Sequence, residues 1–272
     1  MAARKHALKD MTFVEFAERL SEKPVMLLPF GSQEEQGPHA PMGDYMVTER
    51  LSIMAAERSG AIAAPTVPFG NADYFRAIAG GIQLRAETFM MLVEDVVTAF
   101  LDHGVARLII FNGHTSNGPL IEQVLRRIRR ERGITVPTLQ VWQILPPEMW
   151  KRIHAERASA ARGHGADPLT SVYLHLFPEL VRSDLAAAAR PRRALGLEAA
   201  GVRSVTFEGV SVEVPLDVTD VTANGVIGGD PMISSAAAGA EITEWIVAFT
   251  ARFIEHFRKC DPRDVHAPPH GV

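Results

Sequence analysis

The sequence predicts an α/β protein, a three-layer α/β/α sandwich with a central, mainly parallel sheet. Short apolar runs typical of strands alternate along the chain with longer segments whose apolar residues recur every three to four positions, as on one face of a helix. This alternation is typical of parallel sheets, because consecutive parallel strands are usually joined by a crossover helix. The chain has 272 residues, 47% of them hydrophobic, which is enough for one large core.

The first half of the chain shows the alternation clearly. Thr12 and Glu15 form a capping-box pair that predicts a short helix, and the apolar run 25–30 after it predicts a buried strand. Further strands are predicted at 61–67, 108–111 and 136–144. Helices are predicted between these strands, at 45–58, 86–103 and 118–132.

The second half is less regular. Helices are predicted at 147–161 and 168–177, and a long C-terminal helix is predicted at 233–257. The Ala- and Arg-rich stretch 184–203 is expected to be a surface connection, and residues 205–214 are expected to form a β-hairpin. We expect residues 1–260 to form a single domain and the tail 261–272 to be disordered.

Composition excludes several classes of partner. A net charge of -4 and a pI near 6.2 give no electrostatic footprint for nucleic acid or for an anionic membrane surface. No window offers 18 uninterrupted apolar residues, and the basic N-terminus is not followed by an apolar signal core. Cys260 is the only cysteine, so no disulfide forms within the chain. We therefore expect a cytoplasmic protein with no nucleic-acid or membrane partner.

A first polar cluster, GSQEEQGPHAPMGD at residues 31–44, directly follows the predicted strand 25–30. Ligands of open α/β sheets bind outside the carboxyl ends of the strands, where this segment is expected to lie. Glu34 and Asp44 would be costly to keep ionised in such a crevice unless a cation or hydrogen bonds compensate their charge. The segment therefore indicates either the beginning of a metal site or a solvated acidic loop.

The second cluster, NGHTSN at residues 112–117, follows the predicted strand 108–111 and places His114 at a second strand end. A single histidine after a strand is often structural. One imidazole and two carboxylates, however, are a set that suits divalent zinc, manganese or iron. In combination with Glu34 and Asp44, His114 is therefore predicted to be a metal ligand.

The third cluster, GHGADP at residues 163–168, comes directly before the predicted helix 168–177. Asp167 is expected to be the N-cap of this helix, with Pro168 as its first residue, and capping alone would account for this aspartate. Capping does not account for His164. The cluster therefore adds a second histidine to the candidate site.

These three clusters, in this order and at this spacing, resemble the motifs of the creatininase (creatinine amidohydrolase) family, which are of the type GSxEQHGPHLPL-x-TD, NGHGGN or NGHYEN, and HAGExETS. Residues 80–84 and 224–231 also resemble that family, so the resemblance covers nearly the whole chain. It implies a single α/β domain, a binuclear metal centre that hydrolyses amide C–N bonds, and a homo-oligomer, commonly a hexamer built as a trimer of dimers.

The resemblance also implies a set of metal ligands. Three residues match ligands of the family directly: Glu34, Asp44 and His114. Gln36 stands where the family has an imidazole ligand, Ser116 where the NGHYEN version has a carboxylate, and Asp167 where the third motif has a glutamate. An amide oxygen is a harder and weaker donor than an imidazole. We expect one tightly bound zinc or manganese ion on the first three residues, and a second, weaker ion shared through Asp44, Gln36 and Asp167.

The mechanism implied by the resemblance uses metal-bound hydroxide, because a divalent ion lowers the pKa of its bound water to about 7. His164 matches the family histidine that passes a proton to the leaving nitrogen. Glu34 and Asp167 are the other predicted catalytic residues. Glu35 is expected to lie behind the ligands or at the surface.

The predicted substrate wall departs most from the family pattern. Tyr74 and Phe75 are expected to pack against a substrate ring, Arg76 to pair with an anionic group, and Ser116 to line the pocket. The predicted substrate is therefore a small, polar, cyclic amide other than creatinine.

Two alternatives stay open. The chain could be a catalytically silent binding or assembly protein that keeps the fold, or it could carry out metal-assisted deformylase or lyase chemistry in the same pocket. The retained carboxylates and histidines favour a hydrolase, because they would be costly to keep in an empty acidic cavity.

Overall fold

The centre of the molecule is a four-stranded parallel sheet, seen in a computed structural model that describes residues 4–271. The strands lie in the order β2–β1–β3–β4 and comprise β1 (Val25–Phe30), β2 (Ile62–Ala63), β3 (Arg107–Asn112) and β4 (Thr138–Gln140). β1 and β3 pair along their whole length, and Phe30 lies opposite Asn112 at the last pair. The loops that leave these two strands therefore start side by side.

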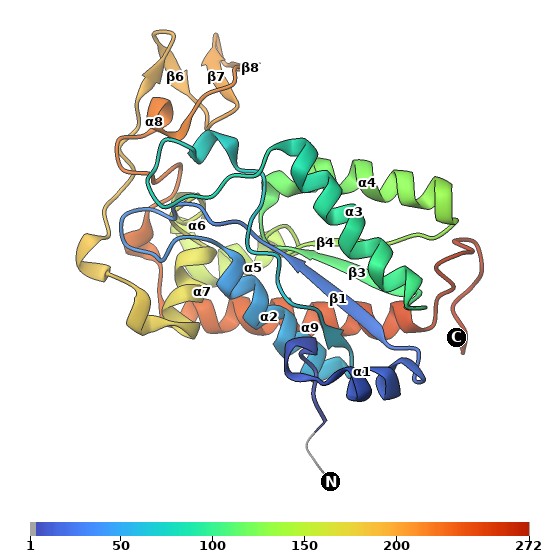
Figure 1. Cartoon of the computed structure of the whole chain (residues 1–272). Helices are drawn as coiled ribbons and strands as arrows, with labels where there is room; N and C mark the ends of the chain where they lie inside the picture. Colours follow the sequence, from blue (N-terminus) through green and yellow to red (C-terminus); the bar gives the residue numbers. More distant parts are fainter. Residues whose placement is uncertain (1–3, 272) are drawn as a thin grey trace.

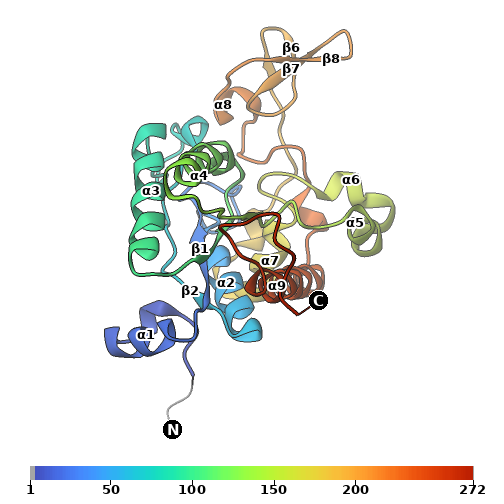
Figure 2. The ribbon, with the colours of Figure 1, turned by 90° about the vertical axis from the view of Figure 1, so that its right-hand side faces the viewer.

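Helices cover both faces of the sheet, which confirms the predicted three-layer fold (Figures 1 and 2). One face carries α3 (Ala86–Asp102) and α4 (Gly118–Arg132). The other face carries α2 (Tyr45–Ser59), α7 (Leu169–Leu176) and α9 (Ala236–Arg258). The short helix α1 (Phe13–Leu20) begins with the predicted capping box, in which Thr12 accepts from the Glu15 backbone and Glu15 accepts from the Thr12 backbone.

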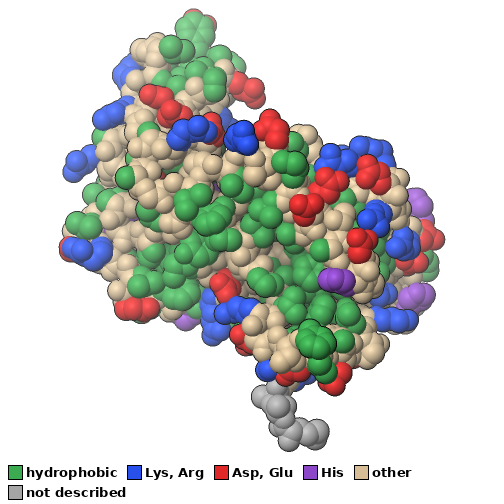
Figure 3. Space-filling view, in the orientation of Figure 1, with side chains coloured by type: hydrophobic (Ala, Val, Ile, Leu, Met, Phe, Trp, Pro, Cys, Tyr) green, Lys and Arg blue, Asp and Glu red, His purple; other side chains and the backbone are tan. Residues whose placement is uncertain are grey.

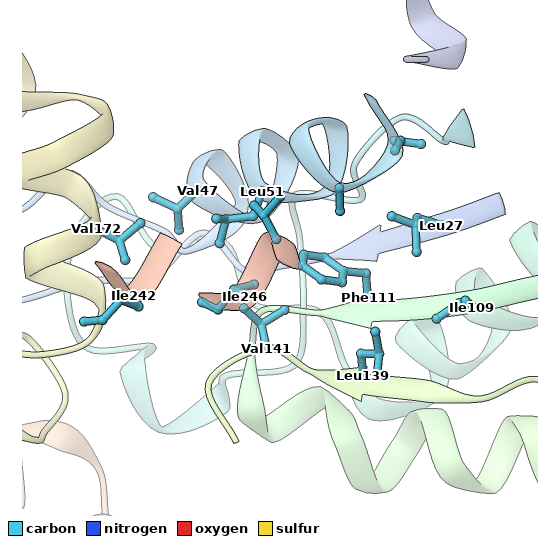
Figure 4. Packing of buried hydrophobic residues seen from close by; sticks show 14 of the residues in the cluster. Leu27, Val47, Leu51, Ile109, Phe111, Leu139, Val141, Val172, Ile242 and Ile246 are labelled. Carbon is cyan, nitrogen blue, oxygen red and sulfur yellow. The ribbon is translucent and has the colours of Figure 1, made fainter. Parts of the chain in front are cut away.

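The core consists of two apolar layers, one on each side of the sheet. Successive residues of a strand point to opposite faces, so Leu27 and Ile109 pack against α2 and α9, whereas Leu28 and Ile110 pack toward α3 and α4. Figure 4 shows the first of these layers, with Phe111 between α2 and α9. Burial on both faces accounts for the continuous apolar run of β1.

Two predicted strands are shorter than expected. The strand predicted at 61–67 is regular only over Ile62–Ala63, because Pro65 interrupts it by removing a backbone donor. The segment still runs beside β1, with the Val67 N–H donating to the Pro29 carbonyl at 3.0 Å. The strand predicted at 136–144 is confined to Thr138–Gln140, since the chain turns after Val141.

The helix predicted at 147–161 is broken into α5 (Pro147–His154), a 3-10 turn and α6 (Ala158–Ala161). The break lies at Ala155, whose φ of 49° is incompatible with a continuing right-handed helix. The C-terminal helix predicted at 233–257 begins three residues later than expected, because Ser235 caps it by accepting a hydrogen bond from the Ala238 N–H.

A second, smaller sheet projects from the body of the molecule, at the top of Figure 1. It is antiparallel and consists of β5 (Arg193–Ala194), β6 (Leu197–Ala199), β7 (Ser204–Phe207) and β8 (Val210–Glu213), followed by the short helix α8 (Val218–Val221). The hairpin predicted at 205–214 is confirmed as β7 and β8. The expectation of a plain surface connection at 184–203 is wrong, because residues 193–199 add two strands to that hairpin.

On the face in Figure 3, charged side chains gather over α3 and α4, and apolar side chains spread across the middle. Among residues 4–271, none of the helices combines the length and the hydropathy needed to cross a bilayer. The tail after Asp261 follows the surface, and the Pro262 carbonyl accepts from the Thr135 N–H at 2.8 Å. The division into a domain at 1–260 and a disordered tail at 261–272 stays a prediction, and residues 1–3 and 272 lie outside the described residues.

Candidate metal centre

Three of the predicted ligands, remote in sequence, meet at the carboxyl ends of β1 and β3. Glu34, Asp44 and His114 are only 2%, 3% and 4% exposed, and each offers one ligand atom within 4.8 Å of the other two. The Nδ1 atom of His114 lies 3.1 Å from Oε1 of Glu34 and 3.0 Å from Oδ2 of Asp44. Among the described residues, no further acidic, histidine or cysteine side chain joins this group.

The backbone places each of these side chains. Glu34 and His114 lie on the loops that follow β1 and β3, which are paired neighbours in the sheet. Asp44 is the N-cap residue of α2, and its Oδ1 accepts from the Ser32 N–H at 2.6 Å. Gly113 lets α2 approach closely, because a Cβ atom at that position would overlap the side chain of Thr48.

The group fits a divalent cation. Oε2 of Glu34 and Nε2 of His114 are buried without a hydrogen-bond partner among the described residues. Two donors bound to one ion at about 2.0–2.2 Å lie roughly 3–3.5 Å apart, and Nδ1 of His114 lies 3.1 and 3.0 Å from oxygens of Glu34 and Asp44. A set of two carboxylates and one imidazole suits divalent zinc, manganese or iron.

The electrostatics of the group agree with this fit. Burial raises the pKa of Asp44 to about 6, although the charge and hydrogen bond of His114 act in the opposite direction. Burial lowers the pKa of His114, but the charges of Glu34 and Asp44 outweigh this and hold the pKa well above its usual value. Two buried carboxylates therefore favour a positive charge between them, as a proton on the imidazole or as a cation.

Gln36, predicted as a metal ligand, and Ser116, predicted to line the substrate pocket, lie beside the group without joining it. Gln36 donates from Nε2 to Oε1 of Glu34 at 2.9 Å, so its amide is bonded to a ligand. Ser116 forms a hydrogen bond with the hydroxyl of Tyr74. The prediction that Ser116 lines the substrate pocket is wrong, because Tyr74 and not Ser116 lines the cavity beside this group.

Asp167 lines the same pocket but is engaged elsewhere. Its Oδ1 accepts from the backbone N–H and the hydroxyl of Ser171, at 3.1 and 2.6 Å, and its Oδ2 lies 2.9 Å from Nε2 of His154. α7 begins at Leu169 with Pro168 as its N-cap, so the expected cap position is wrong by one residue. His154, the last residue of α5, carries no sequence signal that would have linked it to Asp167.

His164 is held by a carboxylate that the sequence did not assign to it. Its Nε2 lies 3.0 Å from Oε1 of Glu35, and its ring stacks on Phe75 with centroids 4.5 Å apart. Burial lowers the pKa of His164, but the hydrogen bond and charge of Glu35 outweigh this and raise it. Glu35 itself is 6% exposed and also accepts from the Gly37 N–H at 2.7 Å. Gly225 packs so closely on Glu35 that a Cβ atom there would overlap the carboxylate.

These side chains surround one cavity of about 350 Å³, which we call the metal pocket. Tyr74 and Phe75 line it as predicted, together with Trp142. Arg76 does not line it, because this side chain is exposed and paired with Asp73. The projecting sheet contributes a further part of the wall, the β6–β7 turn at Gly201 and Val202. No motif in residues 193–203 predicts this contribution.

The fold and the buried carboxylate–imidazole group define a class of α/β protein with a metal-capable centre at the carboxyl ends of its strands. The family model described as creatininase, creatinine amidohydrolase, matches residues 9–254. The chain belongs to the creatininase family.

Relatives of different stated activity match the chain at low identity. The creatinine amidohydrolase of Pseudomonas putida is 27% identical over 190 residues, which are 64% of this chain and 73% of the relative. The 3-dehydro-scyllo-inosose hydrolase of Thermotoga maritima is 24% identical over 68% of this chain and 60% of the relative. The mycofactocin precursor peptide peptidase of Mycobacterium ulcerans is 25% identical over 80% of each chain.

Solved structures agree with the fold. The crystal structure of a creatinine amidohydrolase (creatininase) has a TM-score of 0.78 at 25% identity and covers 93% of this chain and 97% of that chain. A structure named "Creatininase Mn" has a TM-score of 0.76 at 25% identity, and the match covers 93% of this chain and 98% of the chain in that structure. The named relatives are hydrolases, and their names include a small-molecule amide and a peptide among the compounds acted on.

Proposed function

We propose that this protein is a metal-dependent amidohydrolase that cleaves the C–N bond of a small, polar, cyclic amide in the metal pocket. The observation that carries the proposal is the buried group of Glu34, Asp44 and His114, which opens into the same cavity as His164. A cavity of about 350 Å³ is at the small end of the range for ligand pockets and suits a small molecule.

The three residues would hold one zinc or manganese ion tightly, which fits the manganese named for a creatininase relative. A bound divalent ion lowers the pKa of water and polarises an amide carbonyl. The weaker second ion expected at Asp44, Gln36 and Asp167 requires Gln36 to leave Glu34. Oδ2 of Asp167 lies 2.9 Å from Nε2 of His154 but is buried without a hydrogen-bond partner among the described residues.

His164 has the placement needed to move a proton to the leaving nitrogen. Its Nε2 is engaged by Glu35, so Nδ1 is the nitrogen that is available to exchange a proton with a substrate. Phe75 restricts the ring on one side by stacking. The hydroxyl of Tyr74, which bonds Ser116, and the rings of Tyr74 and Phe75 would orient the substrate against the ligands.

Metal analysis and a substrate screen test the proposal together. The panel should contain lactams, formamides, ureido compounds and short peptide amides, because one relative is named as a peptidase. Each compound is incubated with zinc or with manganese, and products are identified so that hydrolysis is separated from lyase or deformylase chemistry.

Two ligand variants give the decisive comparison. We expect Glu34→Ala and His114→Ala to lose the tight ion and to lower hydrolysis at least about a hundredfold. His103→Ala is the matched control, because His103 is an exposed histidine at the end of α3. This variant should keep the tight ion and the hydrolysis. Full hydrolysis in either ligand variant would show that the assigned centre is not the reacting one.

A further inference from the structure

A second, larger cavity lies next to the metal pocket. It occupies about 640 Å³ between α4 and the edge strand β4, and we call it the α4 groove. Thr115, directly after the metal-site histidine, lines both cavities. Arg203 also lines the groove, and its neighbours Gly201 and Val202 line the metal pocket. Thr115 and the β6–β7 turn therefore lie between the two cavities.

The groove is rich in positive charge. Arg126, Arg129 and Arg203 line it, against a single lining carboxylate, Glu122. Glu122 is paired with Arg126 at 2.5 Å, whereas Arg129 and Arg203 have no acidic partner within 4 Å among residues 4–271.

An oriented amide donor adds to these cations. The Asn112 side chain is fixed because its Oδ1 accepts from the His114 N–H at 3.3 Å, so its Nδ2 must be the atom that donates to Oε1 of Gln140 at 2.6 Å. This leaves the Nε2 donor of Gln140, which lines the groove beside Gly118, without an acceptor in the described part of the chain. These guanidinium groups and this amide are donors that suit an anion. Gln140 contacts Gly118 at the start of α4, whereas Arg129 lies eleven residues further along, about 16 Å away at 1.5 Å per residue. The donors are therefore spread along the groove, with Gln140 and Arg203 at the end next to the metal pocket.

We propose that the α4 groove is a second substrate subsite, which receives a carboxylate or phosphate group on the part of the substrate remote from the amide that is cleaved. The inference rests on the proposed function, because it assigns the groove to the substrate of the metal pocket. A small amide fills the metal pocket alone, whereas an amide with an acidic extension occupies both cavities. Pro119, Leu125 and Val136 give the groove an apolar wall along which the extension can pack.

Equilibrium binding to the metal-loaded protein tests the proposal without requiring turnover. The probes are three blocked tripeptide amides that differ only in one side chain, which is glutamate, phosphoserine or glutamine. We expect the glutamate or the phosphoserine peptide to bind about tenfold more tightly than the glutamine peptide. The double variant Arg129→Gln/Arg203→Gln should reduce this preference below about threefold, because the unpaired cations are removed.

The matched control is Arg130→Gln, which removes an exposed arginine of α4 that does not line the groove and should keep the preference. The stronger of the two acidic peptides identifies the anion as a carboxylate or a phosphate. Equal binding of all three peptides, no measurable binding, or a preference that survives in the double variant overturns the proposal. If the preference is found but no amide is hydrolysed, the proposed function fails while the anionic subsite stands.

Discussion

His164 is constrained on two sides, by Phe75 of the pocket wall and by Glu35, which lies behind that wall. Glu35 holds its Nε2 at 3.0 Å, and Phe75 stacks on its ring. A buried imidazole that transfers protons needs both a fixed orientation and a partner for the nitrogen that does not react. Glu35 therefore acts as a positioning residue for His164.

A charge-removing variant tests this role. We expect Glu35→Gln to lower kcat about ten- to a hundredfold with little change in KM, because the proton-transfer group loses its orienting carboxylate while the substrate contacts stay. Steady-state kinetics on a substrate from the screen gives the two constants. Glu87→Gln, an exposed carboxylate of α3, is the control and should change neither. An unchanged kcat in Glu35→Gln would show that Glu35 does not position His164 for proton transfer.

The ligand residues could be predicted from the sequence because each follows or precedes a strongly patterned element. Glu34 and His114 come directly after apolar strands, and neighbouring parallel strands end at one edge. The partner of Glu35 could not be predicted in this way. His164 lies 129 residues further along the chain than Glu35. Glu34 and Glu35 are adjacent, so only the backbone conformation of their loop determines which carboxylate joins Asp44 and His114 and which contacts His164.

At the scale of single elements, α1 is stabilised at its start by a capping box and an ion pair. Glu15 accepts from the Thr12 backbone at 2.6 Å and from Lys5 at 2.7 Å. These hydrogen bonds, with that of Lys5 the larger cause, hold the pKa of Glu15 down at about 2, against a usual 4.5. Because the folded-state pKa is lowered, this contribution to stability is present above pH 4.5 and is lost as the pH falls toward 2.

This predicts a pH-dependent difference between two proteins. Urea unfolding should show Glu15→Gln to be less stable than the parent protein at pH 7, and the difference should shrink as the pH is lowered from 4.5 toward 2. Glu18→Gln, on the same helix, serves as the control, because the Glu18 carboxylate forms no ion pair within residues 4–271. A difference that is independent of pH would contradict the assignment to the ionised carboxylate.

Element prediction succeeded where a periodic pattern was long and failed where proline or tertiary contacts intervened. The helices at 86–103 and 118–132 were predicted within one residue of α3 and α4. The strand at 61–67 was overextended, because apolar residues continue past the proline that ends its regular pairing. The break at Ala155 follows no proline or glycine, and the local sequence therefore gave no reason to place it.

At the scale of the whole molecule, the projecting sheet is the part that the sequence described least well. Its four strands are two to four residues long, and short strands of this kind give a weak alternating pattern. The sheet nevertheless supplies Gly201 and Val202 to the metal pocket and Arg203 to the α4 groove. The turn between β6 and β7 therefore forms part of the wall of both cavities.

The expected hexamer and the cytoplasmic location stay predictions at this scale. Leu195, Phe207 and Val210 of the projecting sheet are 77%, 51% and 65% exposed in the single chain. Sedimentation velocity of the metal-loaded protein would measure the number of subunits directly.

The position of Asp44 has a consequence for work on this protein before any substrate is known. This residue is the N-cap of α2, and Glu34 and His114 lie on the loops that follow β1 and β3, so one ion would link the ends of three core elements. Binding of the ion should then stabilise the folded protein by about 2.7 kcal/mol when the free ion concentration is a hundred times its dissociation constant. The thermal midpoint of unfolding should rise accordingly. Differential scanning fluorimetry across a series of divalent salts would rank the cognate ions by their thermal shifts, and identical curves for all salts and for a chelator would refute the cross-link.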